Sequence, residues 1–369
     1  MLGAAKRKLI KPGSRIRVLV VDDSVVIRRL VSHALSEDPA FEVVGSAANG
    51  AIALARIPQL NPDVVTLDIQ MPEMDGLEAL RHIRRQYPEL CVIMFSTLTE
   101  RGATATLDAL MLGANDYVTK AANVGSLDVS MASLRSELIP KIKQFFLLPG
   151  EPPAPAAAAA APGAAPRPVK PVPAAAARHV GKPRVLAIGV STGGPNALSV
   201  LMPMLPGDFP LPILIVQHMP PLFTRFLAER LSSLGRLRVE EAAEGSPLEP
   251  GKALVAPGDY HMRLARRDSQ VVVRLDQGPP ENSCRPSVDV LFRSVEEIYG
   301  GAAVSVILTG MGQDGLRGAE LLKAAGAWVI AQDEATSVVW GMPGAVVQAG
   351  LADRVVSLEQ VAGEILKLV

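Results

Sequence analysis

The chain of 369 residues carries 37 basic and 37 acidic side chains, so its formal net charge is zero, and its length predicts two domains of roughly 150 residues or more. The balanced charge and an aromatic content of 4% argue against nucleic-acid binding, which requires basic surfaces or stacking platforms. No apolar run approaches the ~18 residues of a membrane helix, and the two cysteines, Cys91 and Cys284, are too few for a disulfide framework. We therefore expect a cytoplasmic protein without direct membrane insertion.

A segment rich in alanine and proline, residues 151–177, divides the chain. Repeated prolines prevent its alanines from forming one helix, so we expect an extended linker. The predicted organisation is a first domain over residues 15–140, a linker over residues 141–182 and a second domain over residues 183–369.

Short β-branched runs alternate with amphipathic stretches in both domains, which predicts parallel sheets with helices between the strands. The expected strands cover residues 16–21, 64–67, 92–95, 185–188, 213–216, 304–308 and 329–331. The expected helices cover residues 25–35, 196–204, 223–234, 288–299 and 316–325. Both domains are thus assigned to the α/β class, in which functional groups gather at the carboxyl ends of the strands.

Acidic side chains follow two predicted strands of the first domain. Asp22 and Asp23 come directly after one strand and Asp68 after another, while Ser96 and Lys120 follow later apolar runs. Clustered carboxylates repel one another and favour a hard cation such as Mg²⁺, and a lysine opposite them stabilises a phosphoryl group. Each aspartate alone is more often a helix cap or a loop residue, but the joint pattern is much more specific.

This pattern, V-D-D-S, then L-D-x-x-M-P-x-M-D-G, a strand-end serine and a lysine, resembles the receiver domain of two-component response regulators over residues 16–139. The resemblance implies a (βα)5 flavodoxin-like fold in which Asp68 accepts a phosphoryl group from a cognate histidine kinase. It also implies a set of ligands and contacts: Mg²⁺ held by Asp22, Asp23, Asp68 and the backbone carbonyl of Gln70, and phosphoryl contacts from Ser96 and Lys120. Receivers usually have proline after this lysine, whereas Ala121 stands here, so we expect a trans or strained loop and an altered switch.

Three polar side chains follow three predicted strands of the second domain. Ser191 lies in G-V-S-T-G-G, His218 in Q-H-M and Asp314 in G-M-G-Q-D-G. Brought together at one sheet edge, they would form a triad in which the histidine takes the serine proton and the aspartate fixes the imidazole. Taken singly, the serine would also suit a helix cap, the glycine run a phosphate cradle, and the histidine a core position.

Two other motifs compete with the triad. Residues 310–315 match the dinucleotide-binding G-x-G-x-x-G, which we discount because Asp314 would repel a pyrophosphate and because the motif comes late in its domain. Residues 189–193 match the G-x-S-x-G of α/β-hydrolases, whose chain order requires a later histidine. The histidine late enough is His261, in a turn-rich segment, for which we expect a structural or rim role.

The motifs G-x-S-T-G-G-P, Q-H-M-P, A-P-G-D-Y-H, R-P-S-V-D-V-L-F-R-S and T-G-M-G-x-D-G together resemble the catalytic domain of chemotaxis protein-glutamate methylesterases over residues 183–369. The resemblance implies these roles: Ser191 as nucleophile, His218 as base, Asp314 as its orienting acid, and the backbone amides of Thr192 and Met311 as the oxyanion hole. Cys284 stands where the family often has histidine. We expect no nucleophilic role for it, because no turn motif and no nearby histidine supports one.

The resemblance implies a doubly wound, mainly parallel serine-esterase domain controlled by phosphorylation of the receiver. Its substrates would be glutamate γ-methyl esters on chemotaxis receptors, with release of methanol, and also receptor glutamines, which it would deamidate. It implies Mg²⁺ in the receiver and no cofactor for the esterase step, and we expect a monomer whose unphosphorylated receiver packs over the Ser191 edge. The alternative is a receiver-controlled module that binds a nucleotide or an anion without hydrolase activity.

Overall fold

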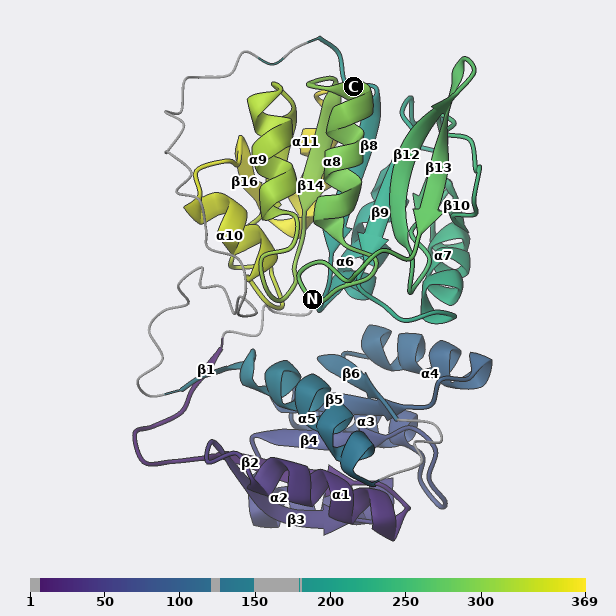
Figure 1. The fold of residues 1–369 in the computed structure, drawn as a ribbon. Coiled ribbons are helices and arrows are strands. Elements are labelled where there is room, and N and C mark those ends of the chain that lie inside the picture. The colour runs from purple at the N-terminus through teal and green to yellow at the C-terminus, as the bar shows by residue number, and fades with distance from the viewer. Residues whose placement is uncertain (1–6, 121–126, 149–178, 180) are drawn as a thin grey trace.

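The computed structural model describes residues 7–120, 127–148, 179 and 181–369 of the chain. Ala121 and the alanine- and proline-rich segment lie outside these residues, so the expectations about them remain predictions. Figure 1 shows two α/β bodies, the N-terminal one in purple to blue-green and the C-terminal one in green to yellow. Within the described part of the chain, every helix is too short or too polar to cross a bilayer.

The N-terminal body is a parallel five-stranded sheet in the order β3-β2-β4-β5-β6 with helices on both faces. Its strands are β2 (Ile16–Val21), β3 (Phe41–Ala47), β4 (Val64–Asp68), β5 (Cys91–Ser96) and β6 (Asp116–Thr119). Its helices are α1 (Val25–Ser36), α2 (Gly50–Leu60), α3 (Gly76–Gln86), α4 (Glu100–Met111) and α5 (Leu127–Lys143).

The continuous apolar run of β2 is explained by burial on both faces of the sheet. Val18 and Val20 pack in one core cluster with residues of α1 and α5, whereas Leu19 and Val21 pack in another with residues of α2, α3 and α4. Beyond α5, the chain adds the short strand β7 (Phe146–Leu147), which pairs in parallel with β1 (Lys8–Leu9).

The C-terminal body is a seven-stranded sheet in the order β10-β11-β9-β8-β14-β15-β16, and all its neighbouring strands are parallel. These strands are β8 (Val185–Val190), β9 (Ile213–Gln217), β10 (Arg238–Glu241), β11 (Lys252–Val255), β14 (Ala303–Ile307), β15 (Trp328–Gln332) and β16 (Arg354–Val356). Within this sheet the chain begins with the central strand β8. It then adds strands on the side of β10, and afterwards on the side of β16. Both α/β assignments, the flavodoxin-like receiver and the doubly wound second domain, are confirmed.

Helices cover both faces of this second sheet. One face carries α8 (Val288–Tyr299), α9 (Leu316–Ala324), α10 (Met342–Gln348) and the antiparallel hairpin of β12 (His261–Arg267) and β13 (Gln270–Asp276). The other face carries α6 (Gly194–Leu201), the 3₁₀ turn η1 (Met202–Met204), α7 (Phe223–Leu234) and α11 (Leu358–Leu366).

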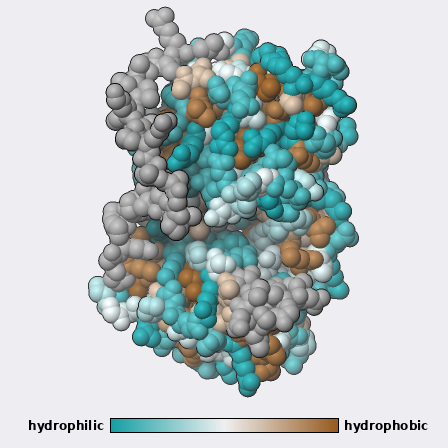
Figure 2. Space-filling view, viewed as in Figure 1, coloured by the Kyte–Doolittle hydropathy of each residue, from teal (hydrophilic) through white to brown (hydrophobic). Residues whose placement is uncertain are grey.

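The viewed surface of the whole molecule is mainly hydrophilic with scattered hydrophobic areas (Figure 2).

The two bodies contact each other through α4 and β6 on one side and α6 and α7 on the other. The rings of Tyr117 and Phe223 stack with centroids 5.1 Å apart and planes 9° from parallel. The Asn196 side chain donates to the Leu110 carbonyl at 2.8 Å, and an ion pair joins Arg230 to Asp108. The N-terminal body thus lies against the elements that follow β8 and β9.

Candidate functional sites

The three aspartates predicted to cluster in the N-terminal body do so at the carboxyl ends of β2 and β4. Carboxylate oxygens of Asp22, Asp23 and Asp68 all lie within 4.8 Å of one another. Asp22 and Asp68 are 2% and 4% exposed, and Lys120 Nζ lies 2.8 Å from a carboxylate oxygen of each. Burial raises the pKa of Asp68, although Lys120 acts to lower it. The lysine is held as a cation, because these two carboxylates outweigh burial and raise its pKa.

A cavity of about 270 Å³ opens beside this cluster, lined by Asp23, Asp68, Gln70, Thr97 and Lys120 among others. Three carboxylates face one ammonium group, so the local charge is negative and remains unbalanced. Oxygen donors of this kind suit Mg²⁺, which binds through few carboxylates and keeps space for other ligands. The residues present therefore fit a magnesium ion and a phosphoryl group.

Ser96 lies at the end of β5, as predicted, but its side chain does not line this cavity. Its hydroxyl accepts a hydrogen bond from Thr106 Oγ1 at 2.5 Å and lies 3.2 Å from the Gly102 carbonyl. The neighbouring Thr97 lines the cavity instead. The phosphoryl contact predicted for Ser96 would require its side chain to turn.

Ser191, His218 and Asp314 follow β8, β9 and β14, which are three adjacent strands of the second sheet. Backbone bonds hold the strand ends in register, since the Ser191 amide donates to the Thr309 carbonyl at 3.0 Å and the His218 amide to Val190 at 3.2 Å. Gly193 follows the serine with a φ of +79°, a left-handed conformation that allows the chain to turn into α6. The parallel sheet therefore gathers the three residues at one edge.

Asp314 is buried and accepts an unusual number of hydrogen bonds. His218 Nε2 lies 2.8 Å from its Oδ2. Further donors within 3.0 Å are the Val288, Asp289 and Gly315 amides, the Ser287 hydroxyl and the Asn282 side-chain amide. Burial acts to raise the pKa of Asp314, but His218 and these donors lower it to about 2. The carboxylate is therefore a fixed anion behind the imidazole.

The other ring nitrogen of His218 faces a cysteine. Cys284 Sγ lies 3.5 Å from His218 Nδ1, so the expectation that no histidine lies near Cys284 is wrong. Among the described residues, no hydrogen bond joins the Ser191 hydroxyl to His218. Burial acts to lower the pKa of His218, but the Cys284 sulfur and the Asp314 carboxylate raise it to about 10. The imidazole is thus placed between a carboxylate and a thiol.

The backbone near Ser191 provides two amide groups that face no acceptor. Within the described part of the chain, neither the Thr192 nor the Met311 amide donates a hydrogen bond. A Cβ on Gly310 would lie 2.8 Å from the Ser191 Cβ, so the loop that carries Met311 passes directly against the serine. The Thr192 side chain instead donates to Asp116 of β6 at 3.0 Å.

His261 bonds to Ser287, whose hydroxyl donates to Asp314, and so supports this edge indirectly. The residue is 1% exposed. Its Nδ1 accepts a hydrogen bond from the Ser287 amide at 3.2 Å, so the ring proton is on Nε2. Nε2 then donates to the Pro279 carbonyl at 3.1 Å. This arrangement fits the structural role expected for it.

Sequence reasoning missed Asn282 and Ser287, whose side chains both donate to Asp314. Ser287 lies within the R-P-S-V-D motif, immediately before α8, and a short polar residue at a buried helix start is a signal that would have identified it. Asn282 carries no such signal. The glycine motif at residues 310–315 holds the buried Asp314 itself, which removes the space that a dinucleotide phosphate would need.

Known proteins match the chain over nearly its whole length. A family model described as CheB methylesterase matches residues 186–365, and one described as response regulator receiver domain matches residues 18–131. A protein-glutamate methylesterase/protein-glutamine glutaminase from Trichodesmium erythraeum is 50% identical over 96% of this chain and 99% of its own. One of the same name from Nocardioides sp. is 54% identical over 95% of each chain.

Among solved structures, the CheB methylesterase catalytic domain of Thermotoga maritima is 44% identical, with a TM-score of 0.50. It covers 51% of this chain and 99% of its own length. Together with relatives of 50% and 54% identity that span both domains, these matches show that the chain belongs to the CheB family of protein-glutamate methylesterase/protein-glutamine glutaminases with an N-terminal receiver domain.

Proposed function

We propose that this chain is a phosphorylation-activated protein-glutamate methylesterase that hydrolyses glutamate γ-methyl esters on chemotaxis receptors and deamidates receptor glutamines. One observation carries the proposal: His218 Nε2 lies 2.8 Å from the buried Asp314, at the sheet edge where Ser191 follows the adjacent strand β8. An imidazole supported by a fixed carboxylate next to a serine is the arrangement needed to activate a hydroxyl.

In the proposed reaction Ser191 Oγ attacks the ester carbonyl while its proton moves to His218. Because Asp314 occupies Nε2, the nitrogen that takes the proton is Nδ1. The Thr192 and Met311 amides stabilise the oxyanion, and His218 returns its proton to the departing methoxide, which leaves as methanol. Water, activated by the same imidazole, then hydrolyses the acyl-enzyme and regenerates Ser191. A glutamine amide follows the same steps and releases ammonia.

The geometry described here corresponds to a resting state. His218 Nδ1 faces Cys284 and has no hydrogen bond to the Ser191 hydroxyl among the described residues, so it is not placed to take the serine proton. The receiver also packs against the residue that follows the nucleophile, through the bond between Thr192 and Asp116. Turnover requires the imidazole to face Ser191, and we propose that release of the receiver permits both this change and the approach of a receptor helix.

In the receiver, we propose that Asp68 accepts a phosphoryl group from a histidine kinase. Asp22, Asp23, Asp68 and the Gln70 carbonyl would hold Mg²⁺, which offsets the charge of the phosphoryl oxygens. Lys120 already spans two of these carboxylates and would contact the phosphoryl group together with a reoriented Ser96. The protein would act in the cytoplasm, as a monomer, with no cofactor in the esterase step.

Methanol release from a methylated receptor fragment tests the function. Ser191→Ala should lower the rate on the order of 10⁴-fold or more, because the nucleophile and its base act as a unit. Ser233→Ala removes an exposed hydroxyl from α7 and serves as the matched control, with an unchanged rate. Near-normal methanol release by Ser191→Ala would exclude Ser191 as the nucleophile, and no release by the wild type in the presence of acetyl phosphate and Mg²⁺ would exclude the function.

A further inference from the structure

A tight turn places Cys284 opposite His218. The amides of Glu281 and Cys284 each donate to the carbonyl of the other, at 3.1 and 2.9 Å. Between them, Asn282 and Ser283 have φ values of 52° and 62°. Two successive left-handed residues closed by paired bonds are typical of a type I′ turn, whose geometry is sharply defined. The direction in which Cys284 leaves the turn is therefore fixed.

Side chains of the turn anchor it to the catalytic edge. Asn282 donates to Asp314 and to Asp289, both at 2.9 Å. Glu281 forms a two-pronged ion pair with Arg293 of α8, with both distances at 2.6 Å. Because Asp314 also binds His218, the cysteine and the imidazole are positioned through one shared carboxylate.

The result is a thiol, an imidazole and a carboxylate in series. Cys284 Sγ lies 3.5 Å from His218 Nδ1, whose opposite nitrogen lies 2.8 Å from Asp314. An imidazole at this distance can accept the thiol proton as the sulfur attacks, as a general base does for a nucleophile. Cys284 is partly exposed, whereas Cys91 is buried. Cys284 thus has the setting of a reactive cysteine.

We propose that Cys284 is a thiol-exchange site through which small-molecule disulfides reversibly switch off the esterase. This inference rests on the proposed function. The Cys284 thiolate attacks one sulfur of the disulfide, a new S–S bond forms, and the old S–S bond breaks. The departing thiolate takes the proton that His218 received from Cys284. The attached group then occupies the side of the imidazole that must face Ser191, and an added thiol reverses the exchange.

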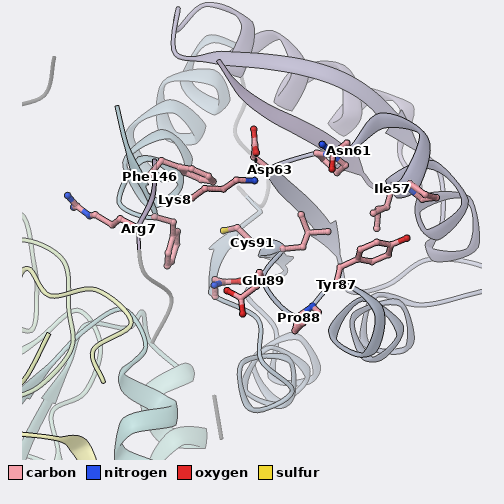
Figure 3. A pocket seen from close by; sticks show the side chains of 15 residues that line it. Arg7, Lys8, Ile57, Asn61, Asp63, Tyr87, Pro88, Glu89, Cys91 and Phe146 are labelled. Atoms are coloured by element: carbon pink, nitrogen blue, oxygen red, sulfur yellow. Dashed lines mark hydrogen bonds and ion pairs between the residues drawn. The ribbon is translucent and has the colours of Figure 1, made fainter. Parts of the chain in front are cut away.

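Cys91, at the start of β5, provides a matched comparison within the same chain. It is 6% exposed at the edge of a cavity of about 570 Å³ between β1, β7 and the loops before β4 and β5. Figure 3 shows its sulfur beside this cavity, with Asp63 and Glu89 among the neighbouring side chains and no histidine labelled. Burial raises the pKa of the Cys91 thiol well above its ordinary value. The neutral thiol exchanges slowly, so Cys91 should not take part.

The test treats the full chain with hydroxyethyl disulfide and measures methanol release before treatment, after treatment and after reduction with dithiothreitol. The wild type should lose activity on the order of 10²-fold, the contribution of a general base, and recover it on reduction. Cys91→Ala should respond as the wild type does. Cys284→Ala and Cys284→Ser should each keep their own untreated rate. The proposal would be overturned if the disulfide lowered the rate of methanol release in both Cys284 variants. It would also be overturned if Cys284 of the wild type were fully modified and the rate of methanol release did not fall.

The rate at which mass spectrometry detects the mixed disulfide gives a second readout that needs no esterase activity. Replacement of the imidazole in His218→Gln should slow modification of Cys284 by roughly tenfold or more, because the thiol loses its proton acceptor. Equal modification rates in this variant and in the wild type would contradict the Cys284–His218 pairing. If untreated wild type releases no methanol, the proposed function has failed, while these rates still decide whether Cys284 is reactive.

Discussion

Buried aspartates lie at the carboxyl ends of both parallel sheets, but their surroundings are opposite in kind. In the receiver, Asp68 shares Lys120 with Asp22, lies close to a third carboxylate, Asp23, and has a pKa that burial raises. In the esterase domain, Asp314 is surrounded by neutral donors and one imidazole, and its pKa is lowered to about 2. The first arrangement leaves a charge imbalance that a cation or a phosphoryl group can alter, whereas the second holds a permanent anion. Similar sheets thus carry an alterable charge cluster at one edge and a fixed anion at the other, which suits the switch and the catalytic role proposed for them.

The largest effect should come from neutralising the permanent anion. Asp314→Asn preserves the shape of the side chain but removes the charge that stabilises the imidazolium, so methanol release should fall on the order of 10⁴-fold. Stimulation by Mg²⁺ and acetyl phosphate, expressed as a ratio, should persist in the residual activity. If methanol release fell by less than tenfold, the charge of Asp314 would not be needed, and the contrast drawn between Asp314 and Asp68 would not hold.

Removing the phosphoacceptor should affect regulation only. Asp68→Asn has no carboxylate to phosphorylate, so acetyl phosphate with Mg²⁺ should stimulate the wild type and leave this variant at its unstimulated rate. Asp63→Asn, an aspartate of the same domain outside the cluster, is the matched control and should respond as the wild type does. Equal stimulation of Asp68→Asn and the wild type would exclude Asp68 as the switch.

The smallest effect concerns stability in acid. The pKa of Asp314 is about 2 in the folded chain against an ordinary 3.8, so its ionised form contributes about 2 kcal/mol of stability. Because the folded value is the lower one, this contribution is present above pH 4 and disappears as the pH falls towards 2. Denaturant unfolding of the wild type and Asp314→Asn should show a difference in unfolding free energy that shrinks over this range. A constant difference would mean that Asp314 is not held as an anion by its neighbours.

Much of the fold follows from local sequence patterns. The predicted strand over residues 185–188 appears as Val185–Val190, and the helix predicted over residues 223–234 has those bounds. The helix expected over residues 196–204 instead begins at Gly194 and ends at Leu201, followed by a 3₁₀ turn containing Pro203. Proline removes a backbone donor, so the regular helix stops before it. The hairpin of β12 and β13 was not predicted, although Met262, Leu264 and Val273 are buried in the core.

The candidate sites, like the fold, contain features that the sequence predicts and features that it does not. Ser191 and His218 were predictable because each directly follows a strand, and Asp314 because it lies in the loop after a third strand; parallel sheets bring such strand ends together. The approach of Cys284 to His218 was not predictable, because 66 residues separate them and the turn between Glu281 and Cys284 contains no glycine. Asparagine tolerates the left-handed conformation, but its presence in a sequence does not predict that conformation. Orientation of a side chain, as for Ser96, lies equally beyond sequence patterns.

The stacked rings of Tyr117 and Phe223 have an energetic consequence for signalling. They belong to different domains, so any separation of the receiver from the esterase breaks this pair and exposes the two ring faces. Aromatic pairs of this geometry contribute about 1 kcal/mol beyond the area they bury. Phosphorylation must offset this free energy, together with that of the other contacts between the domains, to favour the open state. The stacked pair alone reduces the open population about fivefold in the absence of a signal, and thereby lowers the unstimulated activity by the same factor wherever activity requires the open state.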